Sequence, residues 1–426
     1  MLITRIKVSN FYGIKDPIEV IFTEGGKKEK MGYKNIGKER VSLISGFYGA
    51  NAAGKSTILH AIDSIIRVIL ARHQEFVIVN GVKVKQDVVI ALPNFSTEMK
   101  SKPIELEMDF IIDTNKYKYS VSLVNEGREI SKEVLDKNSK NQLTSDPFSL
   151  LEIVYNRYRQ ITGSVVRIGP HRERPDRVTF VNPNDKSTFV GSQGENVMSI
   201  INQISRKQIN ELNEWCKLLG IPYNLTRKRF KQFNISQLIL KDEEGMSVSL
   251  ADVGYGIGQV LPIILTSMLT RNTIITIEQP ELHLHPKLQA NLADLFIRSA
   301  STLNNNFILE THSEHIILRM KRRQKEARET RLDQGIKKQK SSANTVFELN
   351  QKPRYRSFPS NIGDFEMAKW ISIRDSVVIS VIDTPKNKSE SEFSKITLNS
   401  GGDFDTHWPG DFFPERYKEL GLEDDF

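Results

Sequence analysis

Ser45-Gly-Phe-Tyr-Gly-Ala-Asn-Ala-Ala-Gly-Lys-Ser-Thr-Ile-Leu59 is the stretch that decides the fold, because it contains the pattern G-x-x-x-x-G-K-S between Gly49 and Ser56. Residues 40–45, just before the pattern, read as a short buried strand, and residues 57–66 carry apolar side chains at helical spacing. A strand, a glycine-rich loop and a helix in this order are typical of a phosphate-binding loop. The alternative is an ordinary glycine turn before a core helix, and the flanking elements favour the phosphate-binding loop.

The residue types in this loop suit phosphate chemistry. Glycines let backbone N–H groups turn toward the α- and β-phosphates of a nucleotide, and the helix N-terminus adds positive potential. We expect Lys55 to reach the β- and γ-phosphates and Ser56 to ligate Mg²⁺. The predicted nucleotide-binding residues of the loop are Gly49, Asn51, Ala52, Ala53, Gly54, Lys55, Ser56 and Thr57.

Length and composition bound the class of protein. The 426 residues suit two or three domains, and 38% hydrophobic residues are ample for a large core. Residues 1–7 lack the apolar core of a signal peptide, and the longest apolar run, residues 260–269, is too short to span a bilayer. The single cysteine, Cys216, excludes an internal disulfide and a cysteine zinc site. We therefore expect a soluble, cytoplasmic protein that does not enter membranes.

The pattern along the chain divides it into four segments. Residues 1–148 combine the phosphate-binding unit with alternating strands at 2–14, 18–22, 104–112 and 117–123, which predict an antiparallel β-meander. Residues 149–240 are expected to form a mostly helical insertion, without a heptad repeat long enough for a coiled coil. Residues 241–343 form a second lobe of the nucleotide-binding head, and residues 344–426, with short strands, form a small C-terminal α+β domain. The predicted fold class is α/β, with a mixed sheet.

Three further blocks carry candidate chemistry. Residues 250–262, Leu-Ala-Asp-Val-Gly-Tyr-Gly-Ile-Gly-Gln-Val-Leu-Pro, place alternate glycines before an apolar helix, which predicts a second anion site at a helix N-terminus. The apolar strand 273–277 ends in Glu278, and a carboxylate at the end of a buried strand can hold nucleotide-bound Mg²⁺. A further strand, 306–310, is followed by Thr-His-Ser at 311–313.

Arginines gather in the proline-punctuated turn at residues 167–175. Arg172 and Arg174 there either meet phosphate or a partner's carboxylates, or are ordinary surface arginines beside a turn. The densest basic run of the chain lies at residues 319–340. A solvated helix with internal charge pairs explains much of that run, and binding to a DNA or RNA backbone is the alternative for the excess charge.

The four blocks GANAAGKST (49–57), LADVGYGIGQVLP (250–262), IITIEQPELHLHP (274–286) and ILETHS (308–313) resemble, in this order, ABC-type ATPase heads of the SMC and OLD (overcoming lysogenization defect) families. The most similar subgroup lacks a nuclease domain, ends in a small domain of unknown function and occurs in bacterial anti-phage defence systems. The resemblance implies ATP and Mg²⁺ as ligands, with Ser56 and Glu278 at the metal. It also implies two ATPs sandwiched in a head-to-tail dimer and a switch histidine, His312, at the γ-phosphate. The signature loop that closes over the second subunit's nucleotide would comprise Gly254, Gly256, Gly258 and Gln259.

One position departs from the resemblance. These families usually have Asp then Glu where this chain has Glu278 then Gln279. A neutral amide can orient water but cannot accept its proton, so we expect either slow hydrolysis or replacement by Glu281. The expected catalytic residues are Gln279, Glu281 and His312.

Three functions follow as hypotheses. The first is an ATP-driven switch that oligomerises and controls a separate effector, a nuclease or toxin, in anti-phage defence. The second is an SMC-like ATPase of DNA repair, which the missing coiled-coil arms disfavour. The third is a nucleic-acid-binding protein with a vestigial head.

Overall fold

The computed structural model describes residues 2–12, 14–24, 33–36, 39–48, 54–73, 76–79, 82–85, 102–112, 115–124, 128–136, 166–182, 184–185, 187–323, 326, 379–383 and 394–397. Gly49, Asn51, Ala52 and Ala53 of the expected phosphate-binding loop lie outside these residues, as do residues 327–340 of the basic run. None of the helices within the described part is both long and apolar enough to cross a membrane.

A mainly parallel sheet forms the centre of the molecule. Its strands are β6 (Ile44–Phe47), β12 (Val166–Ile168), β17 (Ile274–Glu278), β18 (Asn306–Glu310), β19 (Ile379–Asp383) and β20 (Ser394–Thr397), in the spatial order β12-β17-β18-β6-β19-β20. Only the β19–β20 pair is antiparallel. Every residue of β6, β17 and β18 is buried, which is the pattern of strands covered on both faces.

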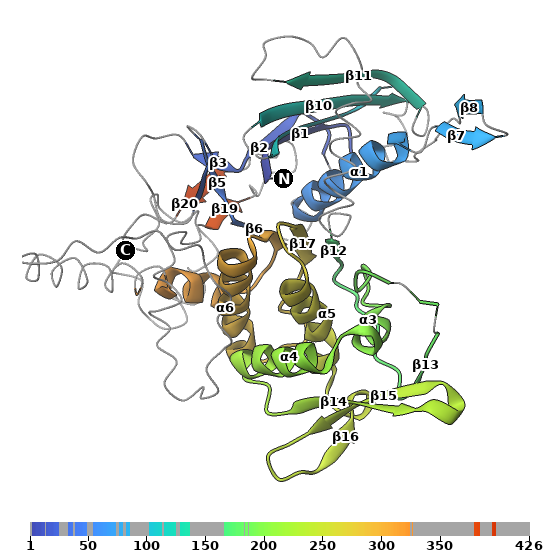
Figure 1. The fold of residues 1–426 in the computed structure, drawn as a ribbon. Helices are drawn as coiled ribbons and strands as arrows, with labels where there is room; N and C mark the ends of the chain where they lie inside the picture. The colour runs from blue at the N-terminus through green and yellow to red at the C-terminus, as the bar shows by residue number, and fades with distance from the viewer. Residues whose placement is uncertain are drawn as a thin grey trace, which may run out of the picture.

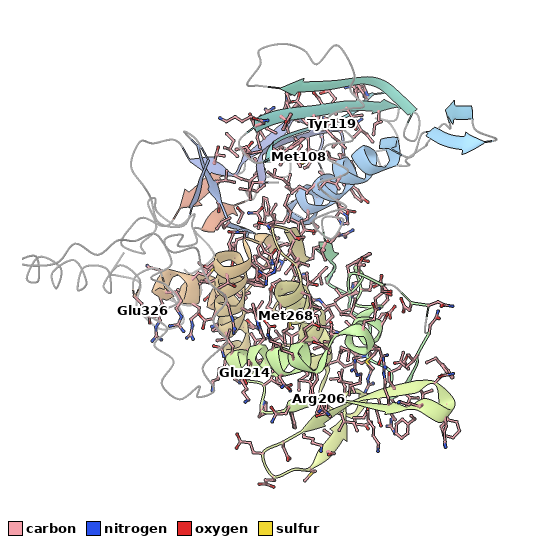
Figure 2. The ribbon with its side chains drawn as sticks, in the orientation of Figure 1. Met108, Tyr119, Arg206, Glu214, Met268 and Glu326 are labelled. Carbon is pink, nitrogen blue, oxygen red and sulfur yellow. The ribbon has the colours of Figure 1, made fainter. Side chains whose placement is uncertain are left out.

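The predicted antiparallel meander is present as a second sheet. It comprises β1 (Leu2–Ser9), β2 (Ile18–Ile21), β9 (Ile104–Ile112), β10 (Asn115–Val124) and β11 (Arg128–Asp136), ordered β11-β10-β9-β1-β2. Met108 and Tyr119 are partners across β9 and β10 and lie on its buried face (Figure 2). Short strands complete this lobe: β3 (Thr23–Glu24), β4 (Tyr33–Ile36) and β5 (Glu39–Ser42) form one sheet, and β7 (Phe76–Val79) pairs with β8 (Val82–Lys85).

Helix α1 (Lys55–His73) lies between the two large sheets (Figure 1). Its apolar side chains, among them Ile58 and Ile62, share one hydrophobic cluster with the meander and with Ile274 and Ile308 of the central sheet. Because successive side chains of a strand point to opposite faces, Ile275 and Phe307 belong to the cluster on the other face. The first residues of α1 are thereby fixed against the end of the central sheet.

The opposite face of the central sheet carries α5 (Tyr255–Leu269) and α6 (Pro286–Leu303), with α4 (Arg206–Leu219) packed beyond them (Figure 1). Helix α4 starts with a capping box between Ser205 and Gln208 and ends at Gly220 in the left-handed conformation, as its sequence favours. The guanidinium of Arg298 lies 4.4 Å from the centre of the Trp215 ring, which joins α6 to α4.

The segment 149–240 is less helical than we expected. Its described residues form α3 (Val197–Gln203) and α4, but also β13 (Thr179–Phe180), β14 (Asn224–Phe230) and β15 (Ile235–Lys241), to which β16 (Ser247–Ser249) adds. Strand β14 could not be predicted from the sequence, because only one of its residues, Leu225, is buried and the alternation of apolar and polar residues is therefore weak. In addition, β12 lies in the central sheet, paired with β17, and not in a separate insertion.

The C-terminal segment also contributes to the centre. Two of the short strands expected in this segment are present as β19 and β20. Strand β19 pairs with β6 in parallel, so this part of the tail extends the central sheet. An edge of β6 would otherwise be open to pairing with another chain.

Candidate nucleotide-binding site at the strand ends

The described part of the phosphate-binding loop begins at Gly54. This glycine has a φ of +90°, a conformation that favours glycine, and α1 starts at the next residue. Lys55 is buried, with 3% of its surface exposed, and Thr57 is buried too. The start of α1 lies beside the end of β18, where Ser56 meets Glu310, and backbone N–H groups at a helix start suit a bound anion.

Three strands deliver their last residues to this helix start. Glu278 of β17 pairs in register with Glu310 of β18, and Glu310 pairs with Phe47 of β6. The N–H of Gln279 donates to the carbonyl of Glu310 at 2.8 Å, so the strands stay paired to their ends. Carboxyl ends of adjacent parallel strands are the usual place for ligands in such sheets.

The hydroxyl of Ser56 contacts Glu310, which was not among the residues predicted for the site. Its Oγ donates to Oε1 of Glu310 at 2.9 Å, while Oε2 of Glu310 is buried without a hydrogen-bond partner among the described residues. Burial, chiefly, and the nearby carboxylates raise the pKa of Glu310. The sequence could have indicated Glu310 as a candidate, because this residue ends a buried strand just as Glu278 does.

Glu278, the expected metal ligand, is engaged by an arginine. Oε1 of Glu278 accepts from Nε of Arg167 at 2.8 Å and lies 2.7 Å from its Nη2. The same Nη2 is 3.2 Å from Nε2 of His60. Arg167 comes from β12, the strand beside β17, which is why these side chains meet.

Arg172 is a buried connector and not a surface residue. Only 5% of it is exposed, and its Nη2 donates to the carbonyls of Glu278 at 2.8 Å and Gln279 at 3.0 Å. Burial lowers the pKa of its guanidinium to about 10, against the opposing effect of two nearby carboxylates. Arg172 therefore holds the turn after β17 through its backbone carbonyls.

That turn is sharp and brings Glu281 beside the two residues that follow β18. Gln279 is half-buried and has a φ of +44°, which is uncommon for a residue other than glycine. Glu281 accepts from Oγ1 of Thr311 at 2.6 Å and from the N–H of His312 at 2.7 Å. Burial raises the pKa of Glu281 and of Tyr48, whose ring is fully buried nearby.

His312 lies half-buried at the same place. Burial, and then the positive charge of Lys55, lower its pKa, so the imidazole is neutral at neutral pH. A neutral imidazole can both donate and accept a hydrogen bond. The structure thus gathers Lys55, Ser56, Glu278, Glu281, Glu310 and His312 around the strand ends.

Most of the block expected to form the signature loop belongs to the start of helix α5. Helix α5 starts at Tyr255, so only Gly254 precedes it, and Gly256 and Gly258 lie in its first turns. A Cβ on Gly256 would be 2.9 Å from the carbonyl oxygen of His283, and one on Gly258 would be 2.9 Å from Cδ of Pro175. These two glycines allow close packing within the chain.

Gln259 was expected in the same loop, but it is a buried residue of α5. It is 2% exposed, and its Nε2 donates to the carbonyl of Arg172 at 2.8 Å. The polar contact of this side chain thus lies within the chain. The exposed part of the block is Gly254 with Tyr255, whose ring lies 5.5 Å from the guanidinium of Arg174.

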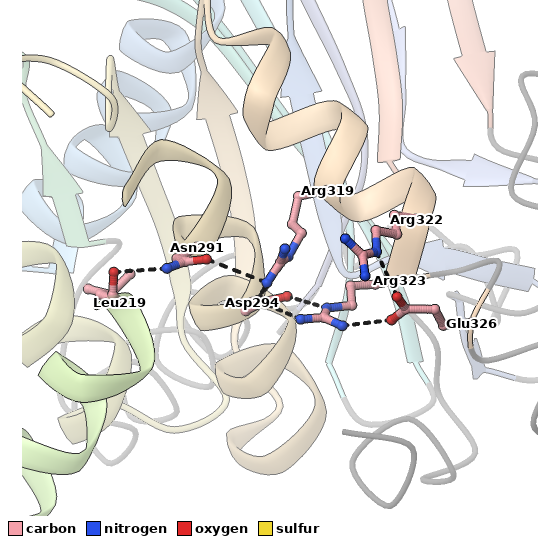
Figure 3. Close-up of polar contacts among 7 residues, drawn as sticks. All are labelled: Leu219, Asn291, Asp294, Arg319, Arg322, Arg323 and Glu326. Carbon is pink, nitrogen blue, oxygen red and sulfur yellow. Dashed lines mark hydrogen bonds and ion pairs between the residues drawn. The ribbon is translucent and has the colours of Figure 1, made fainter. Parts of the chain in front are cut away.

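The basic run begins in a helix over residues 314–323, and two of its arginines are fixed inside the chain. Asp294 of α6 accepts from Arg319 and Arg323, and Arg323 also contacts Glu326 (Figure 3). Asp294 is almost completely buried, whereas Arg322 keeps 66% of its side chain exposed. Arg319 and Arg323 therefore serve the packing of this helix on α6, and the charge pair expected within the helix is present between Arg322 and Glu326.

Comparison with known proteins places the chain in a family. Residues 44–318, more than half of the sequence, match the family described as "AAA domain, putative AbiEii toxin, Type IV TA system". The chain belongs to this family. Its AAA domain spans β6 to the helix after His312 and so includes every strand end of the site. No curated protein matches this chain.

Solved structures similar to this AAA protein are SMC heads. The SMC head domain from Thermotoga maritima is 12% identical, covering 75% of this chain and 92% of that chain, with a TM-score of 0.41. An SMC head bound to the C-terminal winged-helix domain of ScpA is 12% identical, with coverages of 75% and 92% and a TM-score of 0.43. An SMC head with an extended coiled coil, in a Pyrococcus furiosus complex with the ScpA C-terminal domain, is 10% identical, with coverages of 75% and 91% and a TM-score of 0.41.

Proposed function

We propose that this protein binds ATP with Mg²⁺ where β6, β18 and β17 end, and that bound ATP switches its assembly state. The observation that carries the proposal is the convergence of Lys55 and Ser56 with the acids that end β17 and β18. A buried lysine, a serine hydroxyl and carboxylates at a helix start form a donor set for a magnesium nucleotide.

The residues divide the work as follows. Lys55 and the first N–H groups of α1 bind the phosphates, and the metal, when bound, neutralises phosphate charge. Gln279 orients a water, and Glu281 is the nearest alternative proton acceptor. Thr311 and the His312 amide hold Glu281, and its raised pKa makes it a better base at neutral pH. Hydrolysis is slow because no carboxylate occupies position 279.

The proposed switch is a head-to-tail dimer or a larger assembly. Gly254 and Tyr255 are exposed at the start of α5, where free N–H groups can contact the γ-phosphate held by another subunit. Gly256, Gly258 and Gln259 support this surface from behind. His312, which is neutral and close to Lys55, contacts the γ-phosphate and couples its presence to the α5 surface.

The downstream role we propose is control of a separate effector, a nuclease or toxin, in cytoplasmic anti-phage defence. The resemblance to nuclease-less OLD-like heads supports this role.

Light scattering of the purified protein tests the switch. We expect the mass to double or to rise further with Mg²⁺ and a slowly hydrolysed ATP analogue, and to stay at the nucleotide-free value in Lys55→Ala. Glu244→Gln, which changes an exposed carboxylate on the β15–β16 turn, should behave as wild type. Identical masses with and without nucleotide would refute the ATP-driven assembly.

The alternative function is an SMC-like DNA-repair or other DNA- or RNA-binding ATPase. The basic segment 319–340 supports it, although Arg319 and Arg323 are engaged by Asp294. Backbone binding to nucleic acid would lose affinity steeply with salt. If Lys55→Ala left salt-dependent nucleic-acid binding intact while abolishing assembly, the head would act as a switch and not as the nucleic-acid site.

A further inference from the structure

Glu310 has an unusual place for a carboxylate. It is the last residue of β18, the strand between β6, which leads to the phosphate-binding loop, and β17, which carries Glu278. Neighbouring strands lie about 4.8 Å apart, so the end of β17 is one strand farther from β6 than Glu310 is. Position 310 thus ends a strand directly beside β6, and its acid contacts Ser56.

The two oxygens of Glu310 differ in their contacts. Oε1 accepts the Ser56 hydroxyl at 2.9 Å, whereas Oε2 is buried without a hydrogen-bond partner in the described part of the chain. The residue as a whole is 5% exposed. A buried carboxylate oxygen without a partner is costly, and a bound cation would offset that cost.

Glu278, in contrast, is already partnered. Nε and Nη2 of Arg167 both contact its Oε1, at 2.8 Å and 2.7 Å. A cation that recruited this oxygen would have to displace or share the guanidinium of Arg167. The two carboxylates thus differ in how readily they could bind a cation, because the charge of Glu278 is compensated by Arg167, whereas Glu310 is contacted by a neutral serine hydroxyl.

We propose that Glu310, together with Ser56, is the protein's main contact to the Mg²⁺ of a bound nucleotide, with Glu278 held in a supporting position by Arg167. Magnesium takes oxygen ligands and typically keeps one or two protein carboxylates beside phosphates and waters. The described residues contain no group of three or more His, Cys, Asp or Glu side chains suited to a metal, which fits such a shared site. This inference rests on the proposed nucleotide site.

The test compares nucleotide affinity with and without metal. A fluorescent ATP analogue is titrated into wild type, Glu310→Gln and Glu278→Gln, once in Mg²⁺ and once in EDTA. For Glu310→Gln we expect the gain in affinity given by Mg²⁺ to fall roughly tenfold or more. In EDTA the same variant should bind as well as wild type or better, because a negative charge beside the phosphates has been removed. Glu278→Gln should lose less of the metal effect.

Loss of a metal contact should weaken nucleotide binding in Mg²⁺ but not in EDTA. Damage to the fold would weaken binding under both conditions, so the two explanations can be told apart. The exposed-site variant Glu244→Gln should keep the wild-type ratio. A wild-type ratio in Glu310→Gln, or a larger loss in Glu278→Gln, would overturn the inference and leave the nucleotide site standing. Absence of binding by wild type in both conditions would overturn the proposed function as well.

Discussion

Gln279 sits where a proton acceptor is expected, and its backbone is held in a left-handed conformation by the bond from its N–H to Glu310. Because an amide cannot take a proton from water, Gln279→Glu should raise ATP turnover about tenfold or more. Phosphate release at saturating ATP measures this effect. Unchanged turnover would show that Glu281 or another group already serves as the base.

His312 predicts a pH effect on stability. Its pKa lies below 6.5 in the folded chain, so as pH falls through 6.5 the unfolded chain binds a proton that the folded chain does not. This difference destabilises the folded state progressively until the pH reaches the lowered pKa. Between pH 7.5 and 5 the melting temperature should therefore fall more for nucleotide-free wild type than for His312→Asn. Parallel curves for the two proteins would contradict the assignment.

At this scale the sequence predicted much of the site, because motif spacing identifies residues at strand ends and helix starts. It identified Lys55, Ser56, Glu278 and His312, all of which the structure brings together. It could not reveal Arg167 and Glu310 as partners of Glu278 and Ser56, since these contacts depend on which strands are neighbours. It placed Gln259 in the signature loop, and the structure shows this side chain buried against the carbonyl of Arg172.

The first turns of α5 predict different effects for neighbouring glycines. A Cβ on Gly256 would meet a backbone oxygen at 2.9 Å, whereas one on Gly254 would meet nothing within 4 Å. Gly256→Ala should destabilise the chain by about 1–3 kcal/mol, and Gly254→Ala should have little effect on the fold. Urea unfolding of both variants makes the comparison. Equal stability of the two would show that α5 does not need this close approach.

The helix after His312 depends on the ion pairs of Asp294 shown in Figure 3. Asp294→Asn leaves buried arginine charge without its partner, and we expect a loss of about 3–5 kcal/mol in the free energy of unfolding. Arg322→Ala, at an exposed arginine of the same helix, should cost less than about 1 kcal/mol. Chemical denaturation measures both, and a similar small loss in the two variants would contradict the central role of Asp294.

Elements with strong periodicity were predictable, and those whose partners are distant in sequence were not. The helical spacing of residues 57–66 and the alternation at residues 104–112 gave α1 and β9 directly. The short strand β12 carries too few residues to show a pattern, and its place beside β17 is a tertiary effect. Strand β14 was missed because its polar face dominates its composition.

The central sheet of this AAA protein draws strands from three distant parts of the chain: β6, the β12–β18 region and the C-terminal β19. Sequence boundaries at residues 149, 241 and 344 cut through this sheet, because they follow composition and not strand pairing. The proposed dimer adds the exposed start of α5 to the nucleotide site from a second copy.

Calorimetric titration of a magnesium–ATP analogue into wild type and Lys55→Ala tests the central claim most directly. The account predicts one nucleotide per wild-type chain and a loss of about 1.5–3 kcal/mol in binding free energy, roughly 10- to 100-fold in affinity, for Lys55→Ala. Equal affinity of the two proteins, or no binding by wild type, would contradict the claim that ATP is held where β6, β18 and β17 end.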